Sequence, residues 1–188
     1  PMPREELFDR SEVLEKALNL FWTKGYEATS LSDLTKELGI GKGSFYNAFG
    51  SKRKLFDSCL SMYREGAYAL IDNILKHKDD PVSGIKNFLD FHTETMLSDS
   101  EAKGCLIANS STELAHDKKI QSFLLEHNQV MKSKILDFLS GSSLASNADS
   151  IADGLLIHIT GISVISKFMK DPERLKASNE QFLKSLVD

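Results

Sequence analysis

The segment 41–52, GKGSFYNAFGSK, combines cationic, hydroxyl, amide and small side chains within a short stretch. A lysine can neutralise a phosphate, a serine or tyrosine hydroxyl can donate to a phosphate oxygen, and an asparagine can read a base edge. A glycine leaves room for another backbone to come close. This combination suits contact with a nucleic acid better than it suits catalysis.

The same segment lies in a basic part of an acidic chain. The 188 residues carry a net charge of −4, yet residues 36–54 hold five lysine or arginine residues against one glutamate. Such a patch fits either a polyanion-binding module or a solvated helix end. Lys52 would open a long helix, where the exposed backbone N–H groups add to its positive charge.

Two short helices would position these side chains. Ser30 and Asp33 have the spacing of a capping box for a helix that ends near residue 38, and residues 41–49 form the next helix. The turn between them contains Gly39, so the pair predicts a helix-turn-helix. Phe45 and Phe49, one helical turn apart, are expected in the core, which leaves the polar residues on the other faces.

The rest of the chain also has helical periodicity, without sustained period-two alternation. The sequence predicts an all-α fold of about nine helices, with a three-helix N-terminal domain (1–50) and a larger helical domain (51–188). The other helices are expected at about 5–24, 52–77, 81–98, 105–115, 118–140, 149–169 and 172–187, with a loop at 141–148.

Several classes of protein do not fit the sequence. No run of eighteen apolar residues occurs and the N-terminus is polar, so neither a transmembrane helix nor a signal peptide is expected, and a cytoplasmic location fits best. The two cysteines, Cys59 and Cys105, form no CxxC motif, and neither a metal site nor a cofactor is expected. The segment GIGKGS lacks the ending of a P-loop, and no HExxH, EF-hand or GxSxG sequence occurs. A helical enzyme or binding module without a DNA role stays open as an alternative, with no catalytic constellation in its favour.

Residues 10–56, which end in TSLSDLTKELGIGKGSFYNAFGSKRKLF, resemble the DNA-binding domain of TetR-family transcriptional regulators. The chain departs from the family pattern at Leu34-Thr35, where Ile-Ala is common. The resemblance implies a repressor, not an enzyme, that binds double-stranded DNA at a palindromic operator as a homodimer and is released by a small-molecule inducer. It implies DNA contacts from Thr29, Ser30, Lys42, Gly43, Ser44, Tyr46, Asn47 and Lys52.

The second domain carries no comparable motif, and its sites are expected by region. The ligand pocket is expected among the aromatic, sulfur, amide and histidine positions Tyr63, Phe88, Phe91, His92, Met96, Cys105, Asn109, Phe123, His127, Met131 and His158. The last two helices of the family usually form a dimer bundle. The corresponding apolar residues, which would serve equally as core, are Leu155, Ile159, Ile162, Ile165, Phe168, Phe182, Leu183 and Leu186.

Residues 104–106, Gly-Cys-Leu, resemble a subgroup of the family in which this motif opens the sixth helix. In some such regulators the cysteine senses oxidants or electrophiles. A helix N-terminus and the nearby Lys103 would stabilise a thiolate at Cys105. A redox or electrophile sensor that acts through Cys105 is therefore the alternative to reversible ligand binding, whereas a buried, inert cysteine is the structural alternative. Cys59 is expected in the core.

Overall fold

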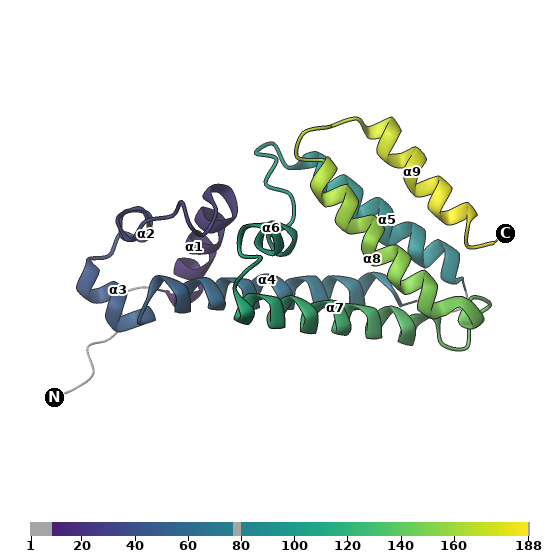
Figure 1. Cartoon of the computed structure of the whole chain (residues 1–188). Helices are drawn as coiled ribbons and strands as arrows, with labels where there is room; N and C mark the ends of the chain where they lie inside the picture. The colour runs from purple at the N-terminus through teal and green to yellow at the C-terminus, as the bar shows by residue number, and fades with distance from the viewer. Residues whose placement is uncertain (1–8, 77–79, 188) are drawn as a thin grey trace. The chain divides into compact units, whose positions relative to one another are not determined.

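The structure is a computed structural model that describes residues 9–76 and 80–187. In these ranges every regular element is helical, comprising α1 to α9 and one short 3₁₀ helix, η1, which confirms the all-α prediction (Figure 1). The chain forms two compact units that divide between Glu65 and Gly66, inside α4. The sequence-based boundary at residue 50 precedes that helix, so the first unit includes a helical segment that the prediction assigned to the second domain.

The first unit is built around buried aromatic rings. Its helices are α1 (Arg10–Lys24), α2 (Leu31–Leu38), α3 (Lys42–Phe49) and the first part of α4 (Lys52–Ile74). Phe21, Phe45 and Phe56 are almost completely buried, and the rings of Phe21 and Phe56 meet edge to face at 5.1 Å. The expected helix at 5–24 begins at Arg10, while residues 5–8 lie outside the described ranges.

The second unit contains the rest of α4 and the later helices. These are α5 (Pro81–Ser98), α6 (Leu106–Glu113), α7 (Lys118–Leu139), η1 (Ala145–Asn147), α8 (Ala148–Ile165) and α9 (Pro172–Lys184). α8 packs against α5, α6 and α7, and α9 packs on α5 (Figure 1). Ile85, Leu89, Ile135 and Leu155 are fully buried in the shared core.

Aspartate side chains begin three helices of this unit. Asp80 accepts from the N–H of Ser83, Asp117 from those of Lys119 and Ile120, and Asp171 from that of Arg174. Proline follows Asp80 and Asp171 at the first helical position, where its missing N–H has no cost. These caps confirm the predicted starts of α5, α7 and α9.

The segment 141–148 is more ordered than the expected loop. Leu144 is only 8% exposed, and its N–H donates to Oγ of Ser142 at 3.2 Å. The turn then continues as η1 into α8. Burying Leu144 in the core gives this polar stretch an anchor that its composition does not reveal.

α8 is the most apolar helix of the described chain. The segment Ala145–Ile165 is long and apolar enough to cross a membrane by length and composition alone, a test that the core helix of a soluble protein also passes. Asp149 and Asp153 interrupt this segment, so it is not an unbroken run of eighteen apolar residues. In the structure α8 buries Ile151, Leu155 and Ile162 inside the second unit, and that packing accounts for its composition.

Candidate nucleic-acid interface and ligand cavity

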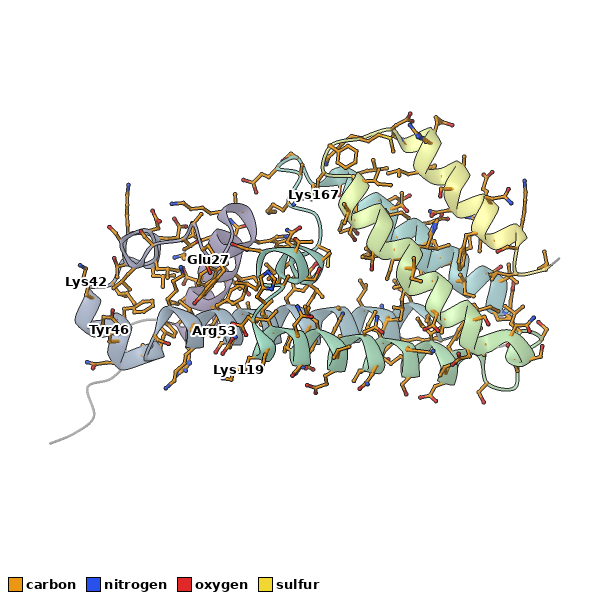
Figure 2. The ribbon with its side chains drawn as sticks, in the orientation of Figure 1. Glu27, Lys42, Tyr46, Arg53, Lys119 and Lys167 are labelled. Carbon is orange, nitrogen blue, oxygen red and sulfur yellow. The ribbon has the colours of Figure 1, made fainter. Side chains whose placement is uncertain are left out.

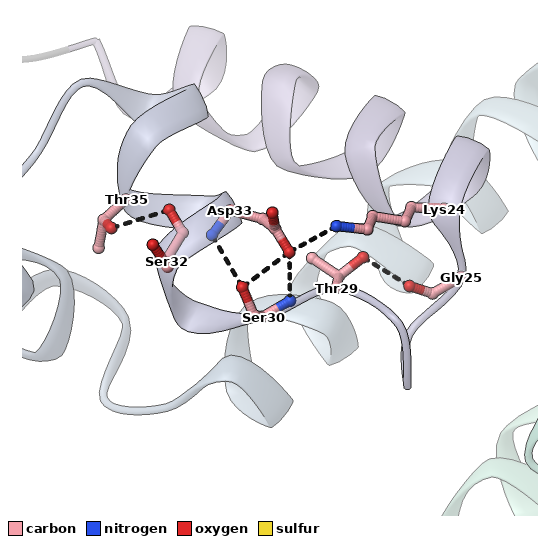
Figure 3. Close-up of polar contacts among 7 residues, drawn as sticks. All are labelled: Lys24, Gly25, Thr29, Ser30, Ser32, Asp33 and Thr35. Atoms are coloured by element: carbon pink, nitrogen blue, oxygen red, sulfur yellow. Dashed lines mark hydrogen bonds and ion pairs between the residues drawn. The ribbon is translucent and has the colours of Figure 1, made fainter.

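A closed hydrogen-bond network fixes the start of α2 (Figure 3). Oγ of Ser30 accepts from the N–H of Asp33 at 3.0 Å and donates to Oδ2 of Asp33 at 2.7 Å, while the N–H of Ser30 donates to the same oxygen at 2.8 Å. Nζ of Lys24 donates to that oxygen at 2.7 Å. The Lys24 ammonium and the two donors of Ser30 hold the pKa of Asp33 below its usual range. The predicted capping box is confirmed.

The two residues expected to contact phosphate before α2 lie in different environments. The side chain of Thr29 is fully buried, and Oγ1 donates to the carbonyl oxygen of Gly25 at 2.5 Å. Ser30 is exposed, although its hydroxyl already serves the capping box. Only Ser30 of this pair has a side chain at the surface, so in this conformation Thr29 stabilises the turn instead of reaching a ligand.

α3 separates an apolar face from a polar one. Phe45 and Phe49 are 0% and 7% exposed, and they lie in the core as predicted. The residues between and before them are exposed: Lys42, Gly43, Ser44, Tyr46 and Asn47. Figure 2 labels Lys42 and Tyr46 on this helix, at the surface of the first unit. The helix therefore presents five polar or small residues to solvent.

Two glycines shape this helix pair. Gly39 ends α2 in the left-handed conformation with φ 66°, which a side chain would strain, and it allows the tight turn into α3. Gly43 has a different role, because a Cβ there would meet no atom of the described residues within 4 Å outside its own helical turn. Packing in the described part of the chain does not require a glycine at position 43, so its small size leaves space for an external group.

Positive charge collects at two helix starts. No described side chain caps the first turn of α3, where Gly41 is the N-cap and Lys42 the first residue. Lys52, which begins α4, is partly exposed, with its ammonium over the ring of Tyr26. At the start of α3, Lys42 lies beside N–H groups that no described side chain caps, an arrangement that attracts phosphate. At the start of α4, the N–H of Lys54 donates to Oγ of Ser51 at 3.1 Å, and Lys52 supplies the positive charge. Nε of Arg53 instead donates to Asp57 at 2.7 Å.

The second unit contains a cavity of about 210 Å³ between its middle helices. His92 of α5 and Cys105, the N-cap of α6, line it. α6 adds Ile107, Ala108 and Ser111. α7 adds Leu124, His127, Asn128 and Met131. α8 adds Leu156, Ile159, Thr160 and Ser163.

The cavity includes only part of the set predicted for the ligand pocket. His92, Cys105, His127 and Met131 are brought together around it. The others lie elsewhere. Phe88 and Met96 are buried, Phe91 is 43% exposed, Tyr63 packs edge to face on Trp22 in the first unit, and Phe123, Asn109 and His158 do not line the cavity.

Two of these residues instead hold the helices together. Nδ2 of Asn109 donates to the carbonyl of Lys103 at 2.7 Å, and its Oδ1 accepts from Nζ of Lys167 at 3.0 Å. Nε2 of His158 lies 2.9 Å from Oδ1 of Asn179, and its ring stacks on Phe182. Both polar groups are satisfied by structural contacts.

The cavity residues that the sequence analysis missed are mainly small or aliphatic. On α7 they share a face with the predicted residues, since positions 124, 127, 128 and 131 recur at the spacing of one helical face. Positions 156, 159, 160 and 163 on α8 have the same spacing. Applying that spacing to the predicted His127 and Met131 would have identified Leu124 and Asn128. The facing residues of α8 need the tertiary packing.

The two cysteines differ as their positions suggest. Cys59 is fully buried, which confirms the prediction that it belongs to the core, and burial raises the pKa of its thiol to about 12. Cys105 is partly exposed and lines the cavity. In the described parts of the chain, no three histidine, cysteine or acidic side chains are grouped so that they could hold a metal ion.

The residues expected at a dimer interface fall into buried and exposed sets. Leu155 and Ile162 are buried inside the second unit and present no surface to a second copy. Ile159, Phe182, Leu183 and Leu186 are partly buried, and all four pack against the core. Ile165 and Phe168 are exposed, at 37% and 77%. The exposed apolar surface also includes Ile157 and Val164 of α8, which the prediction did not name.

Comparison with known proteins places this fold and this site in a family. Residues 13–59 match the model of bacterial regulatory proteins of the tetR family. YezE, an uncharacterized HTH-type transcriptional regulator of Bacillus subtilis strain 168, is 30% identical over 185 residues, which cover 93% of this chain and 94% of YezE. ComR, an HTH-type transcriptional repressor of Escherichia coli K12, is 31% identical over 134 residues, or 71% of this chain and 64% of ComR.

A solved structure agrees over almost the whole chain. It is a cysteine mutant of the TetR-family regulator CifR complexed with a 26-bp double-strand operator DNA, and it superposes with a TM-score of 0.84 and 25% identity over 97% of this chain and 99% of CifR. The helix-turn-helix and the helical second unit thus define a DNA-binding transcriptional regulator and not an enzyme. The chain belongs to the TetR family.

Proposed function

We propose that this chain is a repressor that binds a palindromic operator as a homodimer in the cytoplasm and leaves the DNA when a small molecule occupies the cavity of the second unit. The observation that carries the proposal is the exposed face of α3. There Lys42, Ser44, Tyr46 and Asn47 lie at the surface, and Gly43 leaves open space between them. Phe45 and Phe49 anchor this face to the core.

Each exposed residue has a role in the proposed complex. Lys42 and Lys52 neutralise phosphates at two helix starts, and the Tyr46 hydroxyl donates to a phosphate oxygen. Ser44 and Asn47 contact base edges or phosphates, while Gly43 allows the DNA backbone to come close. Of the two contacts predicted before α2, only Ser30 has its side chain at the surface to join them, because Thr29 is buried. The operator complex of CifR and the repressor ComR support these roles by relationship.

A dimer follows from the geometry of operators. One helix-turn-helix covers a half-site. To read a palindrome, two of them must lie about 34–36 Å apart, which is one turn of the DNA, or a larger whole number of DNA turns apart. Exposed apolar residues supply a surface that a second copy would cover. They are Ile157, Val164 and Ile165 of α8 and Phe168, which follows that helix. Phe182, Leu183 and Leu186, which are partly buried, would extend this surface, whereas Leu155 and Ile162 would not.

Induction requires a ligand with different affinities for two states of the protein. A shift from 1:99 to 99:1 between the bound and released forms takes about 5.5 kcal/mol of differential binding. The cavity of about 210 Å³ lies between α5, α6, α7 and α8, and it is the proposed site of that ligand. His92, Cys105, His127 and Met131 are the predicted pocket residues that the proposal retains.

Selection of bound sequences from random duplex DNA, at moderate salt, tests the proposal. The wild-type chain should enrich a palindrome, and Tyr46→Ala should lose that enrichment while keeping its fold by circular dichroism. A chain that enriches no sequence at any salt, even after denaturation and refolding to remove a bound molecule, would contradict the proposal.

The position of Cys105 favours a second candidate mechanism. Cys105 precedes α6 as its N-cap and lines the cavity, so its thiol is placed where a reagent in the cavity would meet it. In this mechanism, oxidation or alkylation of Cys105 releases the operator, as the resemblance to the Gly-Cys-Leu subgroup implies. Cys105→Ser would then bind operator normally and lose only the response to the oxidant. A wild-type response in that variant would leave reversible binding as the mechanism.

A further inference from the structure

The wall of the cavity contains no charged side chain. Among the described residues that line it, the polar groups are histidine, serine, threonine, asparagine and one thiol, and the others are aliphatic or methionine. A charged ligand would have to leave water without meeting an opposite charge, at a cost of several kcal/mol. The composition of the wall therefore selects against carboxylates, phosphates and amines.

The hydrogen bonds of His92 assign its tautomer. Nε2 lies 3.0 Å from the carbonyl oxygen of Ile159 and 2.9 Å from Oγ of Ser163. The Ser163 hydroxyl donates to that same carbonyl at 2.9 Å. Neither oxygen then has a hydrogen to give to Nε2, so Nε2 must carry the proton and donate. In a neutral ring Nδ1 is consequently an acceptor.

The ring is neutral under physiological conditions. Burial lowers the pKa of His92 to about 4, against the smaller opposing effect of its bond to the Ile159 carbonyl, and the nearby His158 lowers it further. Nδ1 makes no hydrogen bond with any residue in the described ranges, and it is not sealed from solvent. His92 lines the cavity, and its unbonded Nδ1 is the acceptor that we assign to a molecule bound there.

The size of the cavity limits its occupant. A cavity of about 150 Å³ is enough for benzene. Scaling in proportion, about 210 Å³ holds a molecule of about eight non-hydrogen atoms. This is below the usual range of about 300–1,000 Å³ for ligand pockets, so the part of a ligand that the cavity encloses is small.

We propose that the cavity binds a small, uncharged, largely apolar hydroxyl compound of about eight non-hydrogen atoms, whose hydroxyl donates to Nδ1 of His92. The inference rests on the proposed function, because it names the chemical class of the inducer. The apolar part of the ligand contacts Leu124, Met131 and Leu156, which line the cavity with His92. The hydroxyl is recognised by a histidine that Ser163 and the Ile159 carbonyl hold in one tautomer.

Isothermal titration calorimetry on the full chain at pH 7.5 tests the inference with four probes of similar size. Benzyl alcohol and cyclohexylmethanol are the neutral alcohols, and benzylamine and benzoate are the charged counterparts. The alcohols should bind at least tenfold more tightly than either charged probe. Equal affinity for a charged probe would overturn the inference. The absence of binding of either alcohol at concentrations up to about 5 mM would also overturn it, because the dissociation constant would then lie above the millimolar range.

Two variants test the role of His92. His92→Phe removes the acceptor and should weaken benzyl alcohol by about tenfold or less, in line with the loss of one hydrogen bond. His116→Phe makes the same substitution at an exposed histidine and should bind like the wild type. Should His92→Phe not fold, Ala108→Leu fills the cavity and must abolish binding of both alcohols. Wild-type affinity in the folded His92→Phe or Ala108→Leu variant would overturn the inference.

Operator binding, measured on the same preparations, separates this inference from the proposed function. A chain that binds the selected operator and no alcohol retains the proposed function and overturns the ligand class. A chain that binds alcohols and enriches no operator overturns the proposed function and leaves the ligand site. Release of operator by benzyl alcohol in the wild type, but not in Ala108→Leu, supports both.

Discussion

The ammonium of Lys52 lies 4.3 Å from the centre of the Tyr26 ring. That ring packs on Phe56 at 4.7 Å and on Phe21 at 6.1 Å, so it belongs to the aromatic core of the first unit. A cation over an aromatic face is attracted by the ring and loses part of its freedom. The positive charge at the start of α4 is therefore held in place before any DNA arrives.

Lys52→Met removes this charge and keeps most of the apolar stem. Because the proposed contact is to a phosphate, affinity for operator and for random DNA should fall by the same factor, and the slope of log K against log salt should decrease by about one. Fluorescence anisotropy over a series of salt concentrations measures both quantities.

Lys54→Met is the matched control for that measurement. Lys54 lies on the same first turn of α4 and is exposed, although it is not among the predicted DNA contacts. Its substitution should leave the salt slope unchanged. A loss confined to the operator in Lys52→Met, or an equal change of slope in both variants, would contradict the phosphate contact of Lys52.

Substitutions of Ser30 separate its role in the cap of α2 from its proposed contact with DNA. Its hydroxyl is engaged with Asp33 in both directions, so Ser30→Ala should lower the free energy of unfolding by about 1 kcal/mol. Ser30→Gly should cost only a few tenths of a kcal/mol. We expect both folded variants to keep the wild-type salt slope on DNA. Because a neutral hydroxyl releases no counterion, its proposed phosphate contact would appear instead as an equal loss of affinity for operator and for random DNA in Ser30→Gly.

The cysteines should differ sharply in reactivity. With a pKa of about 12, the thiolate fraction of Cys59 at pH 8 is about one in ten thousand, and its Sγ lies 3.8 Å from the Leu14 carbonyl inside the core. Iodoacetamide should therefore label only Cys105 in the native chain and both residues in guanidinium chloride. Peptide mass spectrometry identifies the labelled site, and Cys105→Ser is the control. Native labelling of Cys59 would contradict its burial.

The helix-turn-helix could be predicted because its determinants are local. The capping box of Ser30 and Asp33, the left-handed Gly39 and the one-turn spacing of Phe45 and Phe49 each involve neighbours in the sequence. Such short-range patterns fix a helix start, a turn and a buried face without knowledge of the rest of the fold. The exposed residues of α3 follow directly from those three features.

The cavity and the outer face of α8 could not be predicted in the same way. α8 is apolar on most sides, so its sequence does not distinguish the buried Leu155 and Ile162 from the exposed Ile157 and Val164. That choice depends on which neighbours α5 and α7 supply. Likewise, the residue types of Asn109 and His158 favour a place in a ligand pocket. In the structure Asn109 is hydrogen-bonded to Lys167 and His158 to Asn179, both distant in the sequence.

His92 should make stability depend on pH. Its pKa is about 4 in the folded chain and about 6.5 in the unfolded one, so between these values the unfolded state binds more protons. The contribution of the neutral His92 to the free energy of unfolding is fully present above pH 6.5. It declines as the pH falls toward 4, by up to about 3 kcal/mol. Urea unfolding of the wild type at pH 7.5 and pH 5 should show this loss.

Comparison of two variants isolates the contribution of His92. His92→Gln should unfold with a smaller difference between pH 7.5 and pH 5, because it removes a buried group that must gain a proton on unfolding. His116→Gln replaces an exposed histidine and should keep the wild-type difference. The same pH dependence in His92→Gln and the wild type would assign the loss to other groups.

Gly84 and Gly66 form a matched pair of helix glycines with opposite expectations. Gly84 is buried on α5, and a Cβ there would overlap Cζ of Phe138 and lie 3.2–3.3 Å from both Cε atoms. Phe138 is 2% exposed and cannot move aside, so Gly84→Ala should destabilise the second unit by about 1–3 kcal/mol.

Gly66 is exposed on α4, and a Cβ there would meet no atom within 4 Å. Gly66→Ala should therefore stabilise by up to about 1 kcal/mol through helix propensity alone. Urea denaturation measures both, and a stabilising Gly84→Ala would show that α5 and α7 can separate to admit a methyl group.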